Sequence, residues 1–246
     1  MKILVCISKA PDTTSRIAFT EGDTKFDENG VQFIVNPYDE WYALVRGLEL
    51  KETLGGSVTT VTVGGADNDP VIRKALAIGA DNAVRIDADP ADSFDVASQI
   101  VSYAKDQGFD LVLTGKETIN YNSGVTGALI AEMLDMPYVA LATKLDVDGG
   151  TATITREVPG GTEVVEVATP VVLSAAKGMA EQRIPNMRGI MAARKKPLEV
   201  VAGVPSIGQT SIVSYALPPA KGDVKLVDAE NVAELVRLLH EEAKVI

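Results

Sequence analysis

The residues best suited to chemistry lie in one segment, Asp110–Leu134, which reads DLVLTGKETINYNSGVTGALIAEML. An apolar run at Leu111–Leu113 is typical of a buried strand, and apolar residues at helical spacing begin again at Val125. The polar loop between them is longer than the roughly 2–6 residues usual in α/β units. Small residues leave the backbone N–H groups of the helix start open, and such groups favour a phosphate. The segment predicts a nucleotide site, against the alternative of an ordinary connection that binds nothing.

Other residues offer little catalytic chemistry. We expect Ser123 to cap the helix of this segment, since its hydroxyl can accept a bond from a backbone N–H. The chain has one histidine, His240, and one cysteine, Cys6, which argues against a metal site or a Ser-His-Asp arrangement. Glu157 and Glu163 could act as a carboxylate pair, but solvated or ion-paired strand residues are the commoner case. A nucleotide site without a visible catalytic group favours a binding or carrier subunit over a self-sufficient enzyme.

Alternating strand and helix patterns surround this segment. Buried strands are expected at Lys2–Ser8, Ser57–Val63, Ala83–Ile86, from Asp110, and at Pro170–Ala175. Helix starts are expected at Asn36–Pro37, Asp69–Pro70 and Ser93, whereas residues 9–30 show no regular pattern. The alternation predicts an α/β fold with a doubly wound, mostly parallel sheet of the Rossmann-like, adenine-nucleotide-binding type. Ligands of such sheets bind at the carboxyl ends of strands, where the backbone of Cys6 lies.

The pattern changes after Pro137. Alternating residues on both sides of Asp148–Gly150 predict an antiparallel hairpin added to the sheet. Pro- and Gly-rich residues then lead to a final apolar helical stripe from Asp228, which predicts an extended C-terminal arm ending in a helix. We expect residues 1–200 to form the nucleotide-binding domain and residues 201–246 an arm that docks on a partner subunit, although the arm could also fold back on its own domain.

Composition narrows the function classes. The net charge of −11 argues against nucleic acid as a partner. A single cysteine excludes an internal disulfide and favours a reducing compartment, which we take to be the cytoplasm. The first apolar run is too short for a signal peptide or a membrane span, so we expect neither a transit peptide nor direct membrane insertion.

Several motifs together resemble one family. They are ILVCISK at the start, IRKALAIGAD at Ile72–Asp81, LVLTGK followed by Thr126-Gly127, REVPGG-x-E at Arg156–Glu163, and RGIMAARKKPLEVV at Arg188–Val201. Through these motifs the chain resembles the beta (small) subunit of electron-transfer flavoproteins over nearly its whole length. Pro159 departs from the family, which usually has an acidic residue there, but the following Gly-Gly is kept.

The resemblance implies an electron carrier without catalytic residues of its own. It implies a heterodimer with an alpha subunit that holds most of the FAD site, and a structural AMP in this subunit. Electrons would come from dehydrogenases, commonly the acyl-CoA dehydrogenases of fatty acid oxidation, and pass to a membrane quinone oxidoreductase. Carried over residue by residue, the AMP site would comprise Cys6, Asn36, Pro37, Tyr38, Asp39, Val63, Gly115, Lys116, Asn120, Asn122, Ser123, Gly124, Val125 and Thr126.

The resemblance also implies partner-binding residues. The basic stretch at about 180–197 matches the recognition loop of the family, in which Met187 falls at the position of an apolar anchor for the dehydrogenase. One anchor of this kind can contribute about 2 kcal/mol or more, and its neighbours Ile184 and Arg188 would line the same contact. Glu163 matches a family glutamate that pairs with the mobile FAD domain. An exposed ion pair is worth about 0–1 kcal/mol, which suits a reversible contact.

Two alternatives remain open on these residues. In a flavin-based electron-bifurcating branch of the family, a second FAD replaces AMP and NADH is the donor. Val125-Thr126-Gly127 is closer to the AMP type, whereas Pro11–Thr14 resembles the bifurcating branch. A stand-alone ATP-binding module of the stress-protein kind is the alternative from another class, but it leaves the basic loop and the C-terminal arm unexplained.

Overall fold

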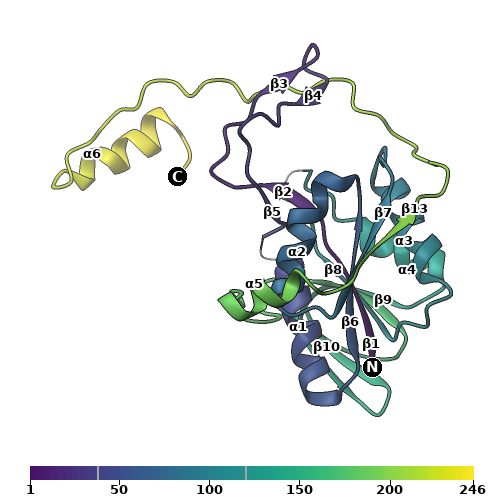
Figure 1. The fold of residues 1–246 in the computed structure, drawn as a ribbon. Helices are drawn as coiled ribbons and strands as arrows, with labels where there is room; N and C mark the ends of the chain where they lie inside the picture. The colour runs from purple at the N-terminus through teal and green to yellow at the C-terminus, as the bar shows by residue number, and fades with distance from the viewer. Residues whose placement is uncertain (38, 120) are drawn as a thin grey trace.

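One large sheet organises the molecule. The computed structural model describes residues 1–37, 39–119 and 121–246. Its main strands are β1 (Lys2–Cys6), β6 (Ser57–Val63), β7 (Asn82–Asp87), β8 (Leu111–Gly115), β9 (Tyr138–Asp148), β10 (Thr151–Val158), β11 (Gly161–Ala168), β12 (Val171–Ala175) and β13 (Leu198–Ala202). Within the described residues these nine strands form a single sheet, in the order β11-β10-β9-β12-β8-β1-β6-β7-β13 (Figure 1).

Helices cover both faces of this sheet. They are α1 (Asp39–Leu54), α2 (Asp69–Ile78), α3 (Ser93–Ala104) and α4 (Thr126–Leu134). Helices α1 and α2 share one apolar core with Ile3 and Val5 of β1, whereas α3 and α4 share another with Leu4 and Cys6. Because successive strand residues point to opposite faces, β1 is buried on both sides. The predicted doubly wound α/β fold is confirmed.

The order of the parallel strands changes direction at β1. From β1 the chain moves outward through β6 and β7, and it then returns to β8 on the other side of β1. Ile3 accordingly pairs with Val58 on one side and with Leu111 on the other. Helix α2 connects strands in one direction along the sheet, whereas α3 and α4 connect strands in the other direction, so right-handed crossovers place them on opposite faces. The carboxyl ends between them are where doubly wound sheets bind ligands.

The predicted antiparallel addition is confirmed at one edge of the sheet. β10 pairs with β9 and with β11 in antiparallel register, with Thr151 opposite Asp148 and Val158 opposite Gly161. Strand β9 begins at Tyr138, earlier than the alternating pattern indicates, because its first half pairs in parallel with β12. β9 therefore joins the parallel core to the antiparallel edge.

Residues 9–30 contain short strands that the sequence does not predict. β2 (Lys9–Pro11) pairs with β5 (Phe33–Val35), and β3 (Phe19–Thr20) pairs with β4 (Lys25–Phe26). The β3–β4 hairpin stands above the carboxyl end of the main sheet (Figure 1). Strands of two or three residues are too short to show an alternating pattern.

The helix starts expected at Ser93 and Asp228 are shifted in the structure. Ser93 is predicted to cap α3, but it is the first helical residue, and the Asp92 carboxylate instead accepts a bond of 2.9 Å from the Asp95 N–H. The final helix is predicted from Asp228, but α6 (Val232–Arg237) begins later, after the N-cap Asn231. Each position offers two cap-forming side chains, Asp92 and Ser93 at the first and Asp228 and Asn231 at the second, so the sequence does not select one of them.

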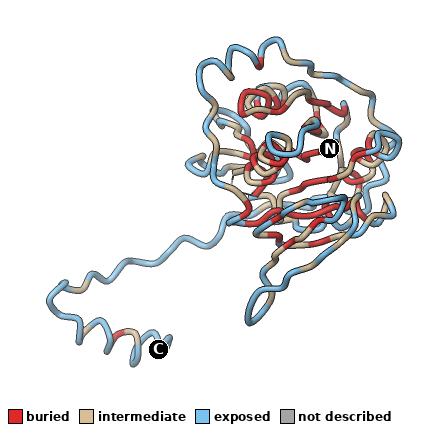
Figure 2. Tube along the Cα trace, turned by 90° about the horizontal axis from the view of Figure 1, so that it is seen from below, coloured by how far each residue is buried: buried red, intermediate tan, exposed pale blue. Residues whose placement is uncertain are grey.

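The last part of the chain leaves the domain. After α5 (Met187–Ala193), β13 pairs in parallel with β7 at the second edge of the sheet, where the sequence predicts no strand. Residues 203–228, all of them described, form neither helix nor strand. The arm ends in α6 and η2 (Leu238–Glu242), far from the sheet and largely exposed (Figure 2). A membrane crossing would need a longer and more apolar helix than any in the described part of the chain.

Candidate functional site

Three of the predicted nucleotide-site residues lie together at the carboxyl ends of the central strands. Cys6 ends β1, Val63 ends β6, and Gly115 ends β8. β6 and β8 are the parallel neighbours of β1, so these three ends lie side by side. Burial raises the pKa of the Cys6 thiol, and the neighbouring charge of Glu40 raises it further. The thiol is therefore protonated and behaves as a small core residue, while its backbone borders the site.

Asn36 fastens the loop between β8 and α4 to the start of α1. Its side chain is fully buried and donates a bond of 3.0 Å to the Glu117 carbonyl oxygen. Its oxygen accepts a bond of 3.1 Å from the Ile119 N–H. The sequence predicts a helix start at Asn36–Pro37, and the described part of α1 begins at Asp39, while the Asn36 side chain bonds to the loop. The Pro37 carbonyl oxygen accepts a bond from the Asp39 N–H at 3.0 Å.

Gly115 brings the end of β8 against the first turn of α1. A Cβ atom at this position would lie 2.9 Å from Cγ of Glu40 and 3.0 Å from its backbone nitrogen. Both distances are shorter than normal van der Waals contact, so a side chain here would push the strand and the helix apart. The next residue, Lys116, leaves the sheet after a final bond of 3.0 Å from its N–H to the Ala175 carbonyl oxygen.

Glu40 is a buried carboxyl at the base of the site. Both of its oxygens accept bonds of 2.7 Å from Ser8, one from the backbone N–H and one from the hydroxyl. Burial raises the pKa of Glu40 to about 8, against the opposing effect of the Ser8 bonds. The site predicted from the sequence does not include Glu40. Its contact with Ser8 spans a long sequence separation, and no local pattern indicates it.

Asp39, the neighbouring carboxyl, is also affected by burial. Desolvation raises the pKa of Asp39 to about 6, the positive charge of Lys116 opposes this rise, and the negative charge of Glu117 adds to it. A protonated Glu40 and a partly protonated Asp39 carry less negative charge than two ordinary carboxylates. The base of the site is therefore more tolerant of a phosphate than its residue types indicate.

The second half of the loop leads into α4 without a cap. Asn122 takes the left-handed conformation at φ 50°, and its N–H donates a bond of 2.8 Å to the Thr118 carbonyl oxygen. Ser123, the predicted cap, lies too early, because α4 begins at Thr126 after the N-cap Val125. The Ser123 hydroxyl instead pairs with the Ser93 hydroxyl at 2.6 Å. The prediction that Ser123 caps this helix is therefore wrong.

The start of α4 fits an anionic group. No side chain in the described ranges caps it, so its first backbone N–H groups keep their capacity to bind an anion. At Gly124 a Cβ atom would lie 3.1 Å from the Lys116 carbonyl oxygen, so a side chain would crowd the loop. The buried hydroxyl oxygen of Thr118 has no hydrogen-bond partner among the described residues. These features agree with a phosphate or a hydroxylated ligand at this loop.

The predicted residues fall into two groups. The first group lies at the carboxyl ends of the central strands and around Asn36, Pro37 and Asp39. The second group, Asn122 to Thr126, lies on the loop that begins at Lys116 and at the start of α4. Tyr38 and Asn120 also belong to the predicted site, but they lie outside the described residues. In the described part of the chain, no group of three or more His, Cys, Asp or Glu side chains could hold a metal ion.

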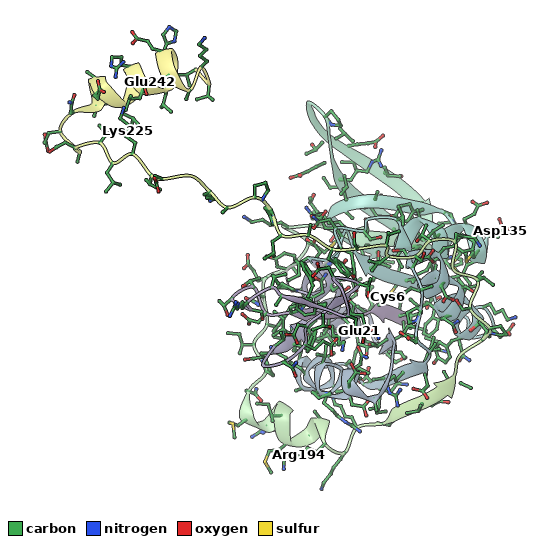
Figure 3. The ribbon with its side chains drawn as sticks, turned by 90° about the horizontal axis from the view of Figure 1, so that it is seen from above. Cys6, Glu21, Asp135, Arg194, Lys225 and Glu242 are labelled. Atoms are coloured by element: carbon green, nitrogen blue, oxygen red, sulfur yellow. The ribbon has the colours of Figure 1, made fainter. Side chains whose placement is uncertain are left out.

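Met187 and its neighbours form a separate surface, which we call the recognition surface (Ile184, Met187, Arg188 and Met191). Met187 begins α5 and is 74% exposed, and Ile184 is 78% exposed. Met187 is therefore not a core residue, and its side chain is accessible to a partner. Seen from above, α5 with Arg194 and the C-terminal end of the arm with Glu242 project from different parts of the molecule (Figure 3).

A rigid scaffold supports this surface. The Asn186 side chain caps α5 by accepting a bond of 2.8 Å from the Gly189 N–H. At Gly189 a Cβ atom would lie 2.5 Å from the Ala77 carbonyl oxygen, so glycine permits the close approach of α5 to α2. Arg73 of α2 donates bonds of 2.9 Å and 2.7 Å to the carbonyl oxygens of Ala193 and Lys196. The exposed apolar side chains are therefore held on a fixed backbone.

Glu163 lies on the antiparallel edge. It is directly opposite Arg156 in the β10–β11 pair, and the Arg156 Nε donates a bond of 2.6 Å to the Glu163 carboxylate. Both side chains are partly exposed. Glu163 therefore already has a cationic neighbour in its own subunit, and any further partner would share its carboxylate with Arg156.

Comparisons with known proteins agree with this architecture. A family model described as the electron transfer flavoprotein domain matches residues 23–205. The electron transfer flavoprotein subunit beta of Bacillus subtilis is 38% identical, with all of both chains covered. The subunit of the same name from Syntrophomonas wolfei is 36% identical over 94% of this chain and 92% of its own. The one from Homo sapiens is 30% identical over 100% of this chain and 99% of its own.

The nine-stranded, mostly parallel sheet with helices on both faces defines a doubly wound α/β protein. Because the family model and the full-length relatives agree, the chain belongs to the electron transfer flavoprotein family and is a homologue of its beta subunits.

Proposed function

We propose that this chain is the beta subunit of a heterodimeric electron carrier, with an AMP at the carboxyl edge of the sheet and FAD held mainly by an alpha subunit. The observation that carries the nucleotide site is the uncapped start of α4 beside Gly124 and the buried Thr118 hydroxyl. Thr118, Asn122 and the first turn of α4 would bind the nucleotide, and the Asn36 bonds would hold the loop around it. FAD supplies the redox chemistry when bound, and AMP supplies none.

The proposed partners follow from the surfaces outside this site. The recognition surface would dock on a dehydrogenase, as in the acyl-CoA dehydrogenases of fatty acid oxidation, with Met187 as the anchor. Exposed apolar residues of the arm, such as Val224 and Leu226, would pack on the alpha subunit. A membrane quinone oxidoreductase would accept the electrons. The single cysteine supports a reducing compartment such as the cytoplasm.

The nucleotide content of the purified heterodimer tests the proposal. The complex would be denatured, and the released nucleotides would be separated by chromatography and quantified. AMP and FAD in equal amounts support the structural-AMP carrier. Two FAD and no AMP per heterodimer would overturn it and favour the electron-bifurcating alternative, to which Pro11–Thr14 gives some support.

A further inference from the structure

The first section of the arm is fastened to the start of α3. The carboxylate of Asp92, the N-cap of α3, accepts bonds of 2.7 Å and 2.8 Å from the backbone N–H groups of Gln209 and Thr210. Asp95, one turn into the helix, is fully buried and accepts a bond from the Ser206 hydroxyl. A carboxylate that accepts several N–H and O–H bonds is an effective anchor for an irregular segment.

The same section is fastened a second time, at Tyr215. Its N–H donates a bond of 2.7 Å to the Asp23 carbonyl oxygen in the β3–β4 hairpin. Its ring stacks on Phe19 of that hairpin, with the ring centroids 4.9 Å apart and the planes at 9°. Beyond Tyr215 the arm bonds to itself, as where the Asn231 N–H donates a bond of 2.9 Å to the Asp228 carbonyl oxygen. Residues 206–215 are therefore a distinct segment, which we call the strap, and the distal arm follows it.

The loop between β8 and α4 is attached at the same two places. At one end, the Ser123 hydroxyl pairs with the hydroxyl of Ser93, which directly follows Asp92 in the chain. At the other end, the Tyr121 side chain hydrogen-bonds to that of Tyr215, and burial followed by this neighbour raises the pKa of the Tyr121 phenol. Figure 1 shows the chain after β13 arching over the carboxyl end of the sheet toward the β3–β4 hairpin. The strap and the loop are therefore held at the same two places above the carboxyl end of the sheet.

We propose that the strap is the outer wall of the nucleotide site, with Asp92 and Tyr215 as positioning residues that hold the loop closed. The inference rests on the proposed function. It gives a role in nucleotide binding to a section of the arm that the sequence analysis expects to dock on a partner subunit. A bound adenine nucleotide would have to displace the strap in order to leave. The strap would thereby set how slowly the nucleotide exchanges, while the distal arm remains free for the alpha subunit.

Hydrogen exchange and nucleotide release in the full heterodimer test this inference. Tyr215→Ala removes the stack on Phe19. The amides of residues 116–125 should then exchange faster than in the wild type, and bound AMP should dissociate roughly 2- to 10-fold faster, as expected for the loss of one aromatic pair. Tyr103→Ala is the matched control, since it removes another aromatic pair, with Phe109 at 6.4 Å, near the opposite end of α3. It should leave both readouts unchanged.

An unchanged exchange rate of the loop amides in Tyr215→Ala would overturn the inference. If that variant fails to assemble, Phe19→Leu removes the same stack from the hairpin side and must produce the same acceleration, or the inference fails. A wild-type complex without AMP would refute the proposed cofactor instead. In that case the exchange of residues 116–125 still decides whether the strap holds the loop.

Discussion

Ser8 and Glu40 are joined by two hydrogen bonds at the base of the candidate site, in which the two carboxylate oxygens of Glu40 accept bonds of 2.7 Å from the N–H and the hydroxyl of Ser8. The pair links the end of β1 to the first turn of α1. The Ser8 bonds suit an ionised carboxyl, but burial outweighs them and raises the pKa of Glu40 to about 8. A buried group of this kind makes stability depend on pH.

Glu40→Gln should stabilise the protein at alkaline pH. The unfolded chain loses the Glu40 proton near 4.5, whereas the folded chain keeps it up to about 8, so the wild type becomes less stable as the pH rises between these values. Glutamine can keep both contacts with Ser8 and carries no charge. The gain in free energy of unfolding should be about 1–3 kcal/mol at about pH 8 and close to zero at about pH 4.5. Urea unfolding of both proteins at the two pH values measures it, and an equal gain at both would contradict the assignment.

Gly115→Ala should destabilise the subunit and lower its nucleotide content. The added Cβ atom would lie 2.9 Å from Cγ of Glu40, so β8 and α1 must separate, at a cost of about 1–3 kcal/mol. Thermal unfolding and nucleotide analysis of the purified complex give the two readouts. Gly161→Ala is the control, because a Cβ atom there meets no atom within 4 Å and no positive φ is involved. A Gly115→Ala complex with normal stability and nucleotide content would refute the close approach.

The central part of the fold is predictable from the sequence because its signals are local. Runs such as Leu111–Leu113 between helical patterns indicate buried parallel strands, and Asp69–Pro70 indicates a helix start that the structure confirms. Strand β13 escapes prediction because its residues, Leu198–Ala202, form an edge strand with several exposed positions and no clear alternation. Edge strands carry weaker patterns than buried ones.

The location of the site can be predicted from the sequence, but its hydrogen bonds cannot. Residues at strand ends converge because parallel strands end at the same edge, so Cys6 and Gly115 could be placed together from the sequence. The bond between Asn36 and Ile119 joins residues 83 positions apart, and the pair of Ser93 and Ser123 joins the start of α3 to the loop before α4. Such contacts depend on how whole elements pack, which no local pattern contains.

Arg156→Gln and Glu163→Gln should act in opposite directions on electron transfer. If Glu163 contacts a cationic surface of the mobile FAD domain, Arg156 competes for the same carboxylate at 2.6 Å. Removing Arg156 strengthens that contact, and removing the Glu163 charge weakens it. Since both side chains are partly exposed, each change should alter the free energy of unfolding by less than about 1 kcal/mol. Stopped-flow rates at low and high salt measure the effect. Rates that respond in the same direction in both variants would exclude this competition.

Met187→Ala should slow electron transfer from the dehydrogenase without disturbing the subunit. The side chain is 74% exposed at the start of α5, so its truncation leaves no cavity in the core. If Met187 enters a pocket on the dehydrogenase, its loss should weaken docking by about 2 kcal/mol or more, which is on the order of a 30-fold slower reaction at limiting carrier concentration.

Met191→Ala provides the matched comparison for this anchor. Met191 lies one turn further along the same helix and is also largely exposed, so it shares the chemistry of Met187 but not its position. Steady-state rates with varied carrier concentration should show a large effect for Met187→Ala, a smaller one for Met191→Ala, and unchanged FAD content and unfolding midpoints in both. Equal effects of the two substitutions would assign docking to the whole apolar surface of α5, and a normal rate in Met187→Ala would remove this residue from the contact.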